Sequence, residues 1–199
     1  MSRKNIDVEK WVKNTALLFY QIFSVDYEDK AFIEKLLSGG GGNSTLCATW
    51  VHLVEFFIPH RISDKAYNLL KEKFGEKIRL EENTVYIPKT IRDKNHSMFA
   101  NNAKGAENRK NAGKYLHFDH NPSNKKVLEL LCNKIKSHKN DEGFLEELTE
   151  YVNSVQTLDL ITVEEDDIRT CADRNFNGPL SSNERDELLH TTFYELVEE

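Results

Sequence analysis

The stretch "GKYLHFDHNPSNKKVLELLCNKIKSHKN", residues 113–140, decides the fold, because its pattern predicts a strand, a turn and then a helix. Pro122 breaks the strand, since proline has no N–H for pairing and biases the preceding residue away from helical geometry. Ser123 or Asn124 can cap the helix that follows. Its apolar positions then predict one buried face: Val127, Leu128, Leu130, Leu131 and Ile135.

The predicted strand carries three polar side chains suited to metal or proton chemistry. Alternation puts His117 and Asp119 on one face and His120 on the other, unless the strand ends or bends at Asp119. We expect such an ending because Pro122 follows closely. An imidazole is a good general base near neutral pH, and a carboxylate is a hard-oxygen ligand for Mg²⁺ or Mn²⁺. The Asp119–His120 pair therefore predicts activation of water beside a phosphate.

The end of this stretch, "HFDHNPSNKKVLELLCNKIKSHKN", resembles the HNH, or ββα-metal, motif of restriction, homing and phage recombination endonucleases. The run "ELLCN" is also similar to a Leu-Leu-Cys and Asn run in phage members of that family. The resemblance implies that Asp119 binds a divalent metal and that His120 takes a proton from water. It also implies that Asn124 is the middle asparagine of the motif.

The resemblance further implies a metal ligand on the helix. Asn133 resembles that ligand, with His138 as a substitute, and His117 is a further candidate. The implied cofactor is Mg²⁺ or Mn²⁺. The implied activity is hydrolysis of phosphodiester bonds in double-stranded DNA by an enzyme of the restriction type, and cutting both strands favours a homodimer.

Charge is distributed unevenly along the chain. The net charge is −6, but residues 141–199 hold 17 acidic and 3 basic side chains, so the first 140 residues carry a net charge of +8. Residues 89–126 hold nine basic side chains against three acidic ones, which suits a polyanion such as DNA. The candidate DNA contacts are Lys89, Arg92, Lys94, Lys104, Arg109, Lys110 and Lys114.

The remaining patterns predict a mostly helical α+β protein with one small β-hairpin besides the strand-turn-helix motif. A helix capped by Ser63 should stop at Gly75, and alternation over residues 77–90 predicts the hairpin. "TLDLITVEEDD" predicts a buried strand that leads into a helix, and Phe193 and Leu196 are expected on a packed helix face.

We expect three regions in one compact body. Residues 1–88 form a helical region with the hairpin, suited to DNA recognition, and residues 89–140 form the basic loop and the candidate catalytic motif. Residues 141–199 form an acidic helical region.

Composition adds expectations about location. No apolar run is long enough to span a membrane, and the N-terminus lacks the pattern of a secretory signal, so a cytoplasmic protein without a membrane partner is expected. Cys47, Cys132 and Cys171 are widely spaced, which favours reduced thiols over a disulfide framework or a zinc knuckle.

Three alternatives remain open. The Asp-His-Asn-Pro turn can arise simply from capping a helix. His117, Asp119 and His120 could instead form part of a hydrolytic zinc site. The acidic region could also act without catalysis, as a mimic of DNA that occupies a nucleic-acid-binding protein.

Overall fold

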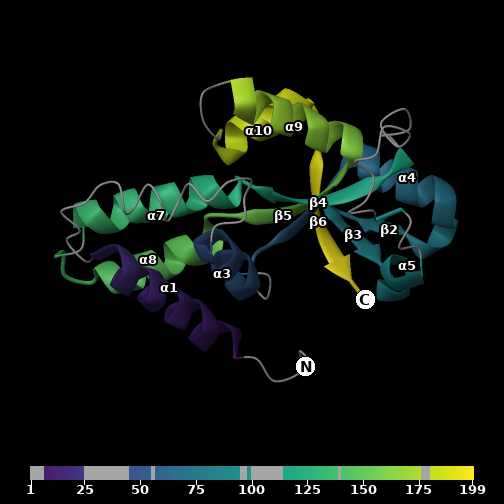
Figure 1. Cartoon of the computed structure of the whole chain (residues 1–199). Coiled ribbons are helices and arrows are strands. Elements are labelled where there is room, and N and C mark those ends of the chain that lie inside the picture. The colour runs from purple at the N-terminus through teal and green to yellow at the C-terminus, as the bar shows by residue number, and fades with distance from the viewer. Residues whose placement is uncertain are drawn as a thin grey trace. The chain divides into compact units, whose positions relative to one another are not determined.

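The computed structural model describes residues 7–24, 45–54, 57–94, 98–99, 114–138, 140–175 and 180–199. The chain forms two compact units, one of residues 1–58 and 122–156 and the other of residues 59–121 and 157–199. The predicted strand and helix of residues 113–140 are both present, as β4 (Leu116–Asn121) and α7 (Asn124–His138), but β4 belongs to the second unit and α7 to the first. Figure 1 labels both elements.

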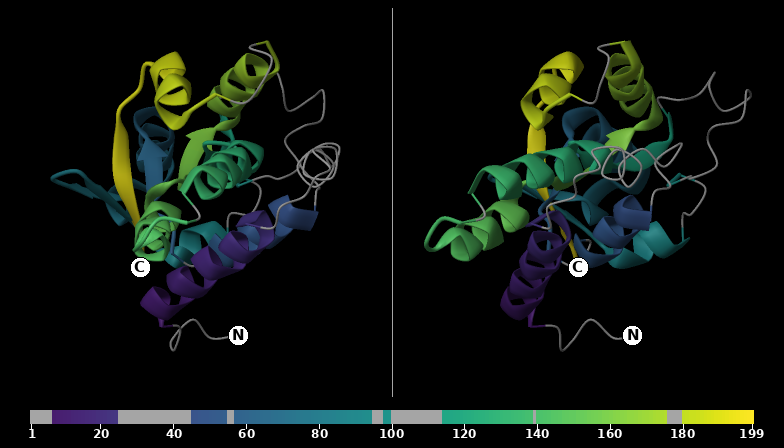
Figure 2. Two further views of the ribbon diagram at one scale, coloured as in Figure 1. Left: turned by 90° about the vertical axis from the view of Figure 1, so that its left-hand side faces the viewer. Right: turned by 60° about the vertical axis from the view of Figure 1, so that its left-hand side comes forward.

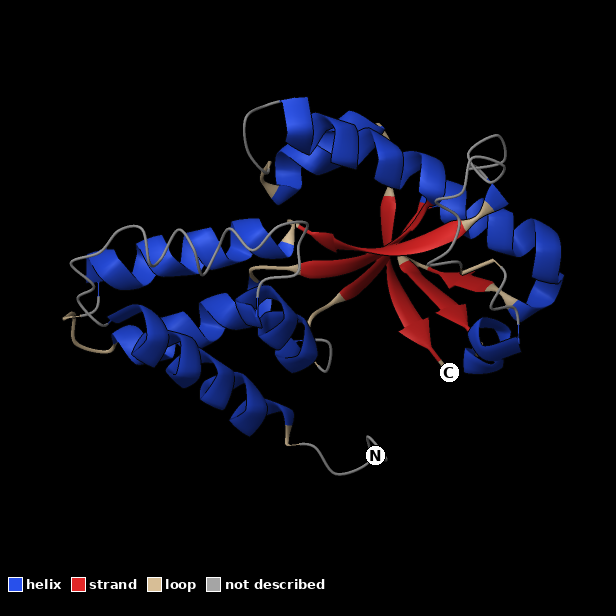
Figure 3. Ribbon diagram, in the orientation of Figure 1, coloured by secondary structure: helices blue, strands red, loops and turns tan. Residues whose placement is uncertain are grey.

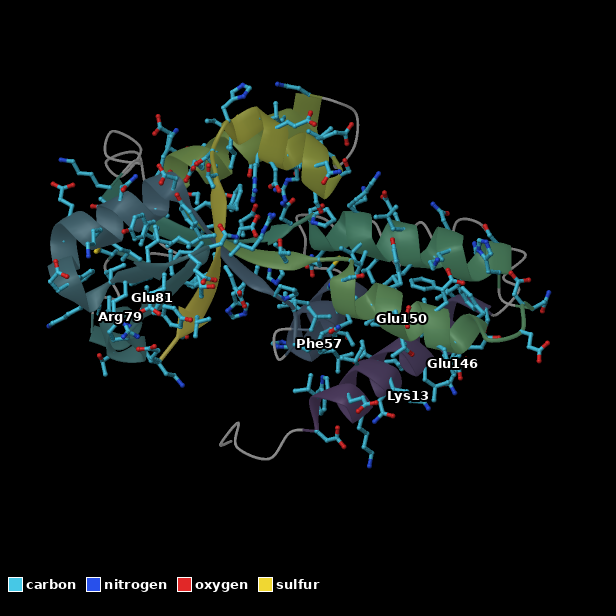
Figure 4. All side chains as sticks on the ribbon, turned by 180° about the vertical axis from the view of Figure 1, so that it is seen from behind. Lys13, Phe57, Arg79, Glu81, Glu146 and Glu150 are labelled. Carbon is cyan, nitrogen blue, oxygen red and sulfur yellow. The ribbon has the colours of Figure 1, made fainter. Side chains whose placement is uncertain are left out.

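The first unit is helical in the part that the structure describes. It contains α1 (Val8–Ser24), α3 (Thr45–Val54), α7 and α8 (Phe144–Ser154), blue in Figure 3. Figure 4 labels Lys13 on α1 and Glu146 and Glu150 on α8, two helices that contact each other. The buried side chains come from one face of each helix, as amphipathic periodicity requires. They include Val12, Ala16, Phe19, Phe23, Trp50, Val54, Leu128, Leu131, Ile135, Leu148 and Val152.

Trp50 ties the core of this unit to the turn before α7. Its Nε1 donates to Gln156 Oε1 at 2.7 Å, and its ring meets that of Phe19 edge-on with centroids 5.2 Å apart. Gln156 Nε2 in turn donates to the Pro122 carbonyl at 2.8 Å and to Asn124 Oδ1 at 2.9 Å. Every one of these buried polar groups has a partner, so the turn is held in one geometry.

The second unit is built on a six-stranded mixed sheet, red in Figure 3, in the order β2-β3-β6-β1-β5-β4. β1 pairs parallel with β5, and β3 pairs parallel with β6, while the other neighbours are antiparallel. The strands other than β4 are β1 (His60–Ser63), β2 (Arg79–Glu81), β3 (Thr84–Ile87), β5 (Thr157–Thr162) and β6 (Phe193–Glu198).

One face of the sheet carries the apolar core of the second unit. The core packs side chains of α4 (Asp64–Phe74) and α5 (Lys89–Lys94) against strand residues such as Ile62, Leu116 and Leu160. Ser63 caps α4 by accepting from Ala66 N, and Gly75 ends it with a φ of 57°, so the predicted helix from Ser63 to Gly75 is confirmed. A short 3-10 helix, η3 (Gly75–Lys77), follows.

The other face of the sheet is covered by α9 (Val163–Asn175) and α10 (Ser182–Leu189). The two helices lie side by side, as both views in Figure 2 show. Thr162 and Glu165 cap α9 reciprocally, because Thr162 N donates to Glu165 Oε2 at 2.8 Å and Glu165 N donates to Thr162 Oγ1 at 3.2 Å. Strand residues whose side chains point to this face therefore meet helices rather than the apolar core.

The outer edge of the sheet is charged. β2 pairs antiparallel with β3, and the chain turns between them at Glu82 and Asn83, where Glu82 has a φ of 54°. Figure 4 labels Arg79 and Glu81 on β2, and their Nη1 and Oε1 atoms lie 3.8 Å apart. Charged side chains on an edge strand disfavour pairing with another chain.

The α+β class is confirmed, but the prediction of few strands is wrong. Residues 193–198 form strand β6 instead of a helix, because they pair antiparallel with β1 and parallel with β3. Tertiary pairing therefore overrides the local pattern. The strand predicted before α9 is confirmed as β5. Most of the basic loop was predicted over residues that lie outside the described ranges. Among the described helices, none has the length and apolar character needed to cross a membrane.

Candidate functional site

Three strands place ionisable side chains at one level on the sheet face beneath α9 and α10. Asp159 on β5 pairs in register with Arg61 on β1 and with Asp119 on β4. Residues paired directly across neighbouring strands point to the same face. The sheet itself therefore sets a guanidinium and two carboxylates side by side.

The covering helices add charges to this row. Arg169 on α9 is fully buried and contacts the acids of two strands: its Nη1 lies 3.1 Å from Asp119 Oδ2 on β4 and 3.0 Å from Asp159 Oδ2 on β5. Its Nη2 donates to Asp186 Oδ1 on α10 at 2.7 Å. A guanidinium presents five N–H donors in a planar fork, which suits contact with several carboxylates at once. Arg169 is thus the central cation of the group.

Arg185 on α10 makes a second set of contacts. Its Nη2 lies 3.1 Å from Asp119 Oδ2 and 3.5 Å from Asp173 Oδ2, and its Nη1 donates to the His120 carbonyl at 2.7 Å. We call the whole group the arginine-aspartate cluster. Its members are Arg61, Arg169, Arg185, Asp119, Asp159, Asp173 and Asp186, so its formal net charge is −1.

The cluster is buried at its centre and open at its edge. The side chains of Arg169 and Asp159 have no exposed surface, whereas 15% of Asp119 and 25% of Asp186 remain exposed. Asp186 also lines an open depression together with Glu187, His190 and Thr191. Asp186 can therefore be reached from this depression, while Asp119 is only slightly exposed.

Arg61 and Asp159 form the tightest pair of the cluster, with Arg61 Nε and Nη2 donating to the two oxygens of Asp159 at 2.9 and 2.8 Å. Burial alone would raise the pKa of Asp159, but the hydrogen bond and charge of Arg61, together with the charge of Arg169, hold that pKa below its ordinary value of 3.8. Burial alone would lower the pKa of Arg61, and its bonds to Asp159 and Asp186 raise it instead.

A pH dependence of stability follows from this pair. Because the pKa of Asp159 is lower in the folded chain, its stabilising contribution is complete above the unfolded value and is lost as the pH falls through the folded value. We expect the free energy of unfolding to fall below about pH 4, and Asp159→Asn to make that fall shallower. Urea denaturation between neutral and acid pH measures both slopes. Equal slopes in the two proteins would contradict the assignment.

The structure separates the two residues that the resemblance pairs. β4 does not end at Asp119 but continues to Asn121, which pairs in register with Thr157, so the expected break is not found. Asp119 therefore points to the cluster, while His120 lies on the opposite face with Phe118, a residue packed against the apolar core.

His117 shares the face of Asp119. The side chain of His117 is 23% exposed, and its Nε2 lies 4.0 Å from Asp166 Oδ2 on α9. The strand geometry therefore brings His117, and not His120, to the side of the sheet that carries Asp119.

The other predicted site residues lie on α7, in the first unit. Asn124 Oδ1 accepts a hydrogen bond from Gln156 Nε2 at 2.9 Å, so this asparagine braces the turn before α7. Asn133 is exposed. His138 is also exposed, with its Nδ1 3.1 Å from the Lys134 carbonyl and its ring stacked on Phe144. These three side chains belong to a different unit from Asp119.

The predicted DNA contacts are only partly described. Lys89 and Lys114 are exposed. Arg92 and Lys94 belong to α5, but the positions of their side chains are not described. Lys104, Arg109 and Lys110 lie outside the described residues.

One oxygen of the Asp119 carboxylate has no contact with the described residues. All contacts of Asp119 with described residues are made by Oδ2, so Oδ1 keeps its lone pairs. Mg²⁺ usually takes one or two carboxylates and completes its shell with water and substrate phosphates. Within the described ranges, no three His, Cys, Asp or Glu side chains form a group that could hold a metal ion. A metal site at Asp119 would therefore need water or substrate phosphates as its other ligands.

Sequence reasoning missed most of the cluster. Asp159 stands in the apolar strand "TLDLIT", and a carboxylate there is a detectable signal of a buried partner. Arg61, Arg169, Arg185 and Asp186 carry no such local signal, because register and helix docking bring them together. Comparison of the chain with protein-family models, curated proteins and solved structures gives no significant match.

Proposed function

We propose that the protein is a divalent-metal-dependent endonuclease that hydrolyses phosphodiester bonds in double-stranded DNA. The observation that carries the proposal is the position of Asp119, a partly exposed carboxylate with one oxygen unengaged, directly beside two arginines. A carboxylate suits the metal, and guanidinium groups suit phosphate. The excess of basic residues in the first 140 positions supports a polyanionic substrate.

The roles of the cluster residues follow from their chemistry. Asp119 would hold Mg²⁺, which when bound lowers the pKa of a coordinated water and polarises the phosphate. Arg169 and Arg185 are the positive charges that contact Asp119, and they would balance negative charge that develops on the phosphate. Asp159 and Asp186 hold these arginines and Arg61 in place.

The proton acceptor is one of the two histidines of β4. The resemblance to HNH nucleases assigns this role to His120, but the strand geometry favours His117, which shares a face with Asp119. We expect His117→Ala to lower the cleavage rate by about 10²-fold or more and His120→Ala to change it only a few-fold. Cleavage of supercoiled plasmid with Mg²⁺ measures both rates. A larger loss of cleavage rate in His120→Ala than in His117→Ala would instead identify His120 as the proton acceptor.

The DNA-mimic alternative receives less support from α9. A mimic would present its acidic residues to a partner, but Glu165 is fully buried and its Oε2 accepts from Ser63 Oγ at 2.8 Å. Asp166 lies near His117, which leaves Glu164 and Asp167 as the exposed acids at the start of this helix. The four acidic residues at the start of α9 therefore do not form a continuous exposed band.

DNA binding itself can be tested without observing cleavage. If Lys104, Arg109 and Lys110 contact phosphates, their replacement by alanine should weaken binding and make the log–log salt dependence shallower by about 0.9 per lost contact. Titration of a labelled duplex at several salt concentrations measures this slope. A wild-type protein that does not bind duplex at low salt would instead favour the mimic, and charge reversal at Glu164 and Asp167 would then be the damaging change.

A further inference from the structure

The carboxylate of Asp186, on α10, accepts hydrogen bonds from three separate elements of the second unit. Arg61 on β1 donates through Nη1 to Oδ2 at 3.0 Å and through Nη2 to Oδ1 at 3.2 Å. Arg169 on α9 donates to Oδ1 at 2.7 Å, and Asn121 on β4 donates to the same oxygen at 2.8 Å. Two guanidinium groups and one amide therefore converge on a single carboxylate.

The two arginines of this group are held in place by contacts that do not involve Asp186. Arg61 forms the bidentate pair with Asp159, and Arg169 Nη1 lies 3.0 Å from the same carboxylate. The ring of Phe193 contacts both guanidinium groups, with its centroid 4.5 Å from Arg61 Cζ and 5.3 Å from Arg169 Cζ. Guanidinium groups stack favourably on aromatic faces. The two positive charges are thus positioned whether or not Asp186 lies between them.

The same place has donors in excess of those that Asp186 satisfies. The Nε atoms of Arg169 and Arg185 are buried, and within the described part of the chain neither finds an acceptor. Asn121 Oδ1 is a buried acceptor in the same state, but it belongs to a neutral amide and weighs less than two charged donors. A ligand at this place should therefore bring acceptor oxygens, which favours an anion over a cation.

Solvent reaches Asp186 directly. Its side chain is 25% exposed and lines the open depression at the edge of the cluster. The buried side chains of α10 are those of Arg185 and Leu189. A change of rotamer about the Cα–Cβ bond of Asp186 can carry the carboxylate toward the depression while these two side chains stay packed. Asp186 can therefore leave its three donors without unfolding of α10.

We propose that Arg61, Arg169 and Asn121 form a binding site for a phosphodiester group, and that Asp186 occupies this site in the free protein as an internal competitor. Carboxylates and phosphates accept the same paired hydrogen bonds from guanidinium groups. A phosphodiester carries one negative charge, as Asp186 does, so the exchange leaves the charge within the site unchanged. The inference rests on the proposed endonuclease function. It adds the place where a substrate phosphate binds and a contact that must open before DNA binds there.

Binding of dimethyl phosphate, followed by phosphorus-31 NMR, tests the site without a cleavage assay. Asp186→Ala removes the internal competitor. We expect this variant to bind the anion about tenfold or more tightly than the wild type, since a site that is mostly occupied by its own side chain shows a reduced apparent affinity. Glu187→Ala is the matched control, because it removes the same charge from an exposed neighbour that lines the same depression. Its affinity should stay within about threefold of the wild type.

The gain must also depend on the proposed donors. Addition of Arg61→Gln to Asp186→Ala should remove the gain in affinity, because it takes away one of the two charged donors. Equal affinities of Asp186→Ala and Glu187→Ala would show that only the overall charge matters, and this would overturn the inference. A gain that survives Arg61→Gln would overturn it as well.

Thermal melting separates binding from folding in the same variants. Asp186→Ala should melt at a lower temperature than the wild type, and dimethyl phosphate should restore more of the difference than sodium chloride at equal ionic strength. Equal recovery with both salts would contradict the site even in a variant that is partly unfolded at the assay temperature. The outcome does not depend on cleavage. Tighter phosphodiester binding by Asp186→Ala would uphold the site even if the wild type does not cut DNA, and unchanged binding would refute the site even in an active nuclease.

Discussion

Arg169→Ala is expected to lower the free energy of unfolding by about 3–5 kcal/mol, the usual cost of removing one partner from a buried ion pair. Arg169 has no exposed surface and contacts Asp119, Asp159 and Asp186 at 3.1, 3.0 and 2.7 Å. Its loss leaves Asp159 buried with Arg61 as its remaining arginine and Thr157 as a further donor, and it takes a positive charge from the other two acids. Urea denaturation at neutral pH measures the change.

Arg174→Ala is the matched control for this prediction. Arg174 lies on the same helix, α9, but is exposed, so its replacement should change the free energy of unfolding by less than about 0.5 kcal/mol. A similar stability for both variants would show that the cluster contributes nothing specific to folding. A normal stability for Arg169→Ala would also mean that the contact between Arg169 and Asp186 does not help to hold α10 in place.

Asp119→Asn is expected to reduce DNA cleavage by about 10²-fold or more, because it removes the charge of the proposed metal ligand while keeping its shape. Mn²⁺, or a higher concentration of Mg²⁺, should restore part of the activity, since a weakened ligand is compensated by a tighter or more abundant ion. Plasmid cleavage at several metal concentrations measures the effect. Binding of duplex DNA in the presence of EDTA should change little.

Asp167→Asn serves as the control, since it removes the same charge from an exposed position of α9 outside the cluster. It should retain most of the wild-type cleavage rate. Circular dichroism must show that Asp119→Asn is folded, because Asp119 also faces Arg169 and Arg185. Full activity in a folded Asp119→Asn protein would exclude this carboxylate from the chemistry.

The sequence was sufficient to predict those helices and strands that are determined by residues close together in the chain. Ser63 and Gly75 bound α4 as predicted, because a side-chain cap and a glycine with positive φ act within one helical turn. The apolar residues of "VLELL" predicted the buried face of α7, and "TLDLIT" predicted strand β5. In each case the residues that decide the structure are neighbours in the sequence.

The candidate site could not be predicted in the same way, because it depends on pairing between distant segments. Arg61 meets Asp159 across 98 positions and Asp186 across 125, and no local rule anticipates either contact. β6 was missed for the same reason, since it becomes a strand by pairing with β1 and β3. The pairing of β4 with β5 also decides which histidine faces the cluster. Because β4 continues to Asn121, His117 lies on the same face as Asp119 and His120 lies on the other face.

Incubation of supercoiled plasmid with the purified wild-type protein tests the central proposal most directly. With Mg²⁺, conversion to nicked or linear DNA is expected, and an equal sample with excess EDTA should remain supercoiled. A preparation of Asp119→Asn purified in parallel excludes a contaminating nuclease. Supercoiled plasmid that persists with Mg²⁺ and with Mn²⁺, in a sample shown to be folded and to bind duplex DNA, would contradict the proposed endonuclease.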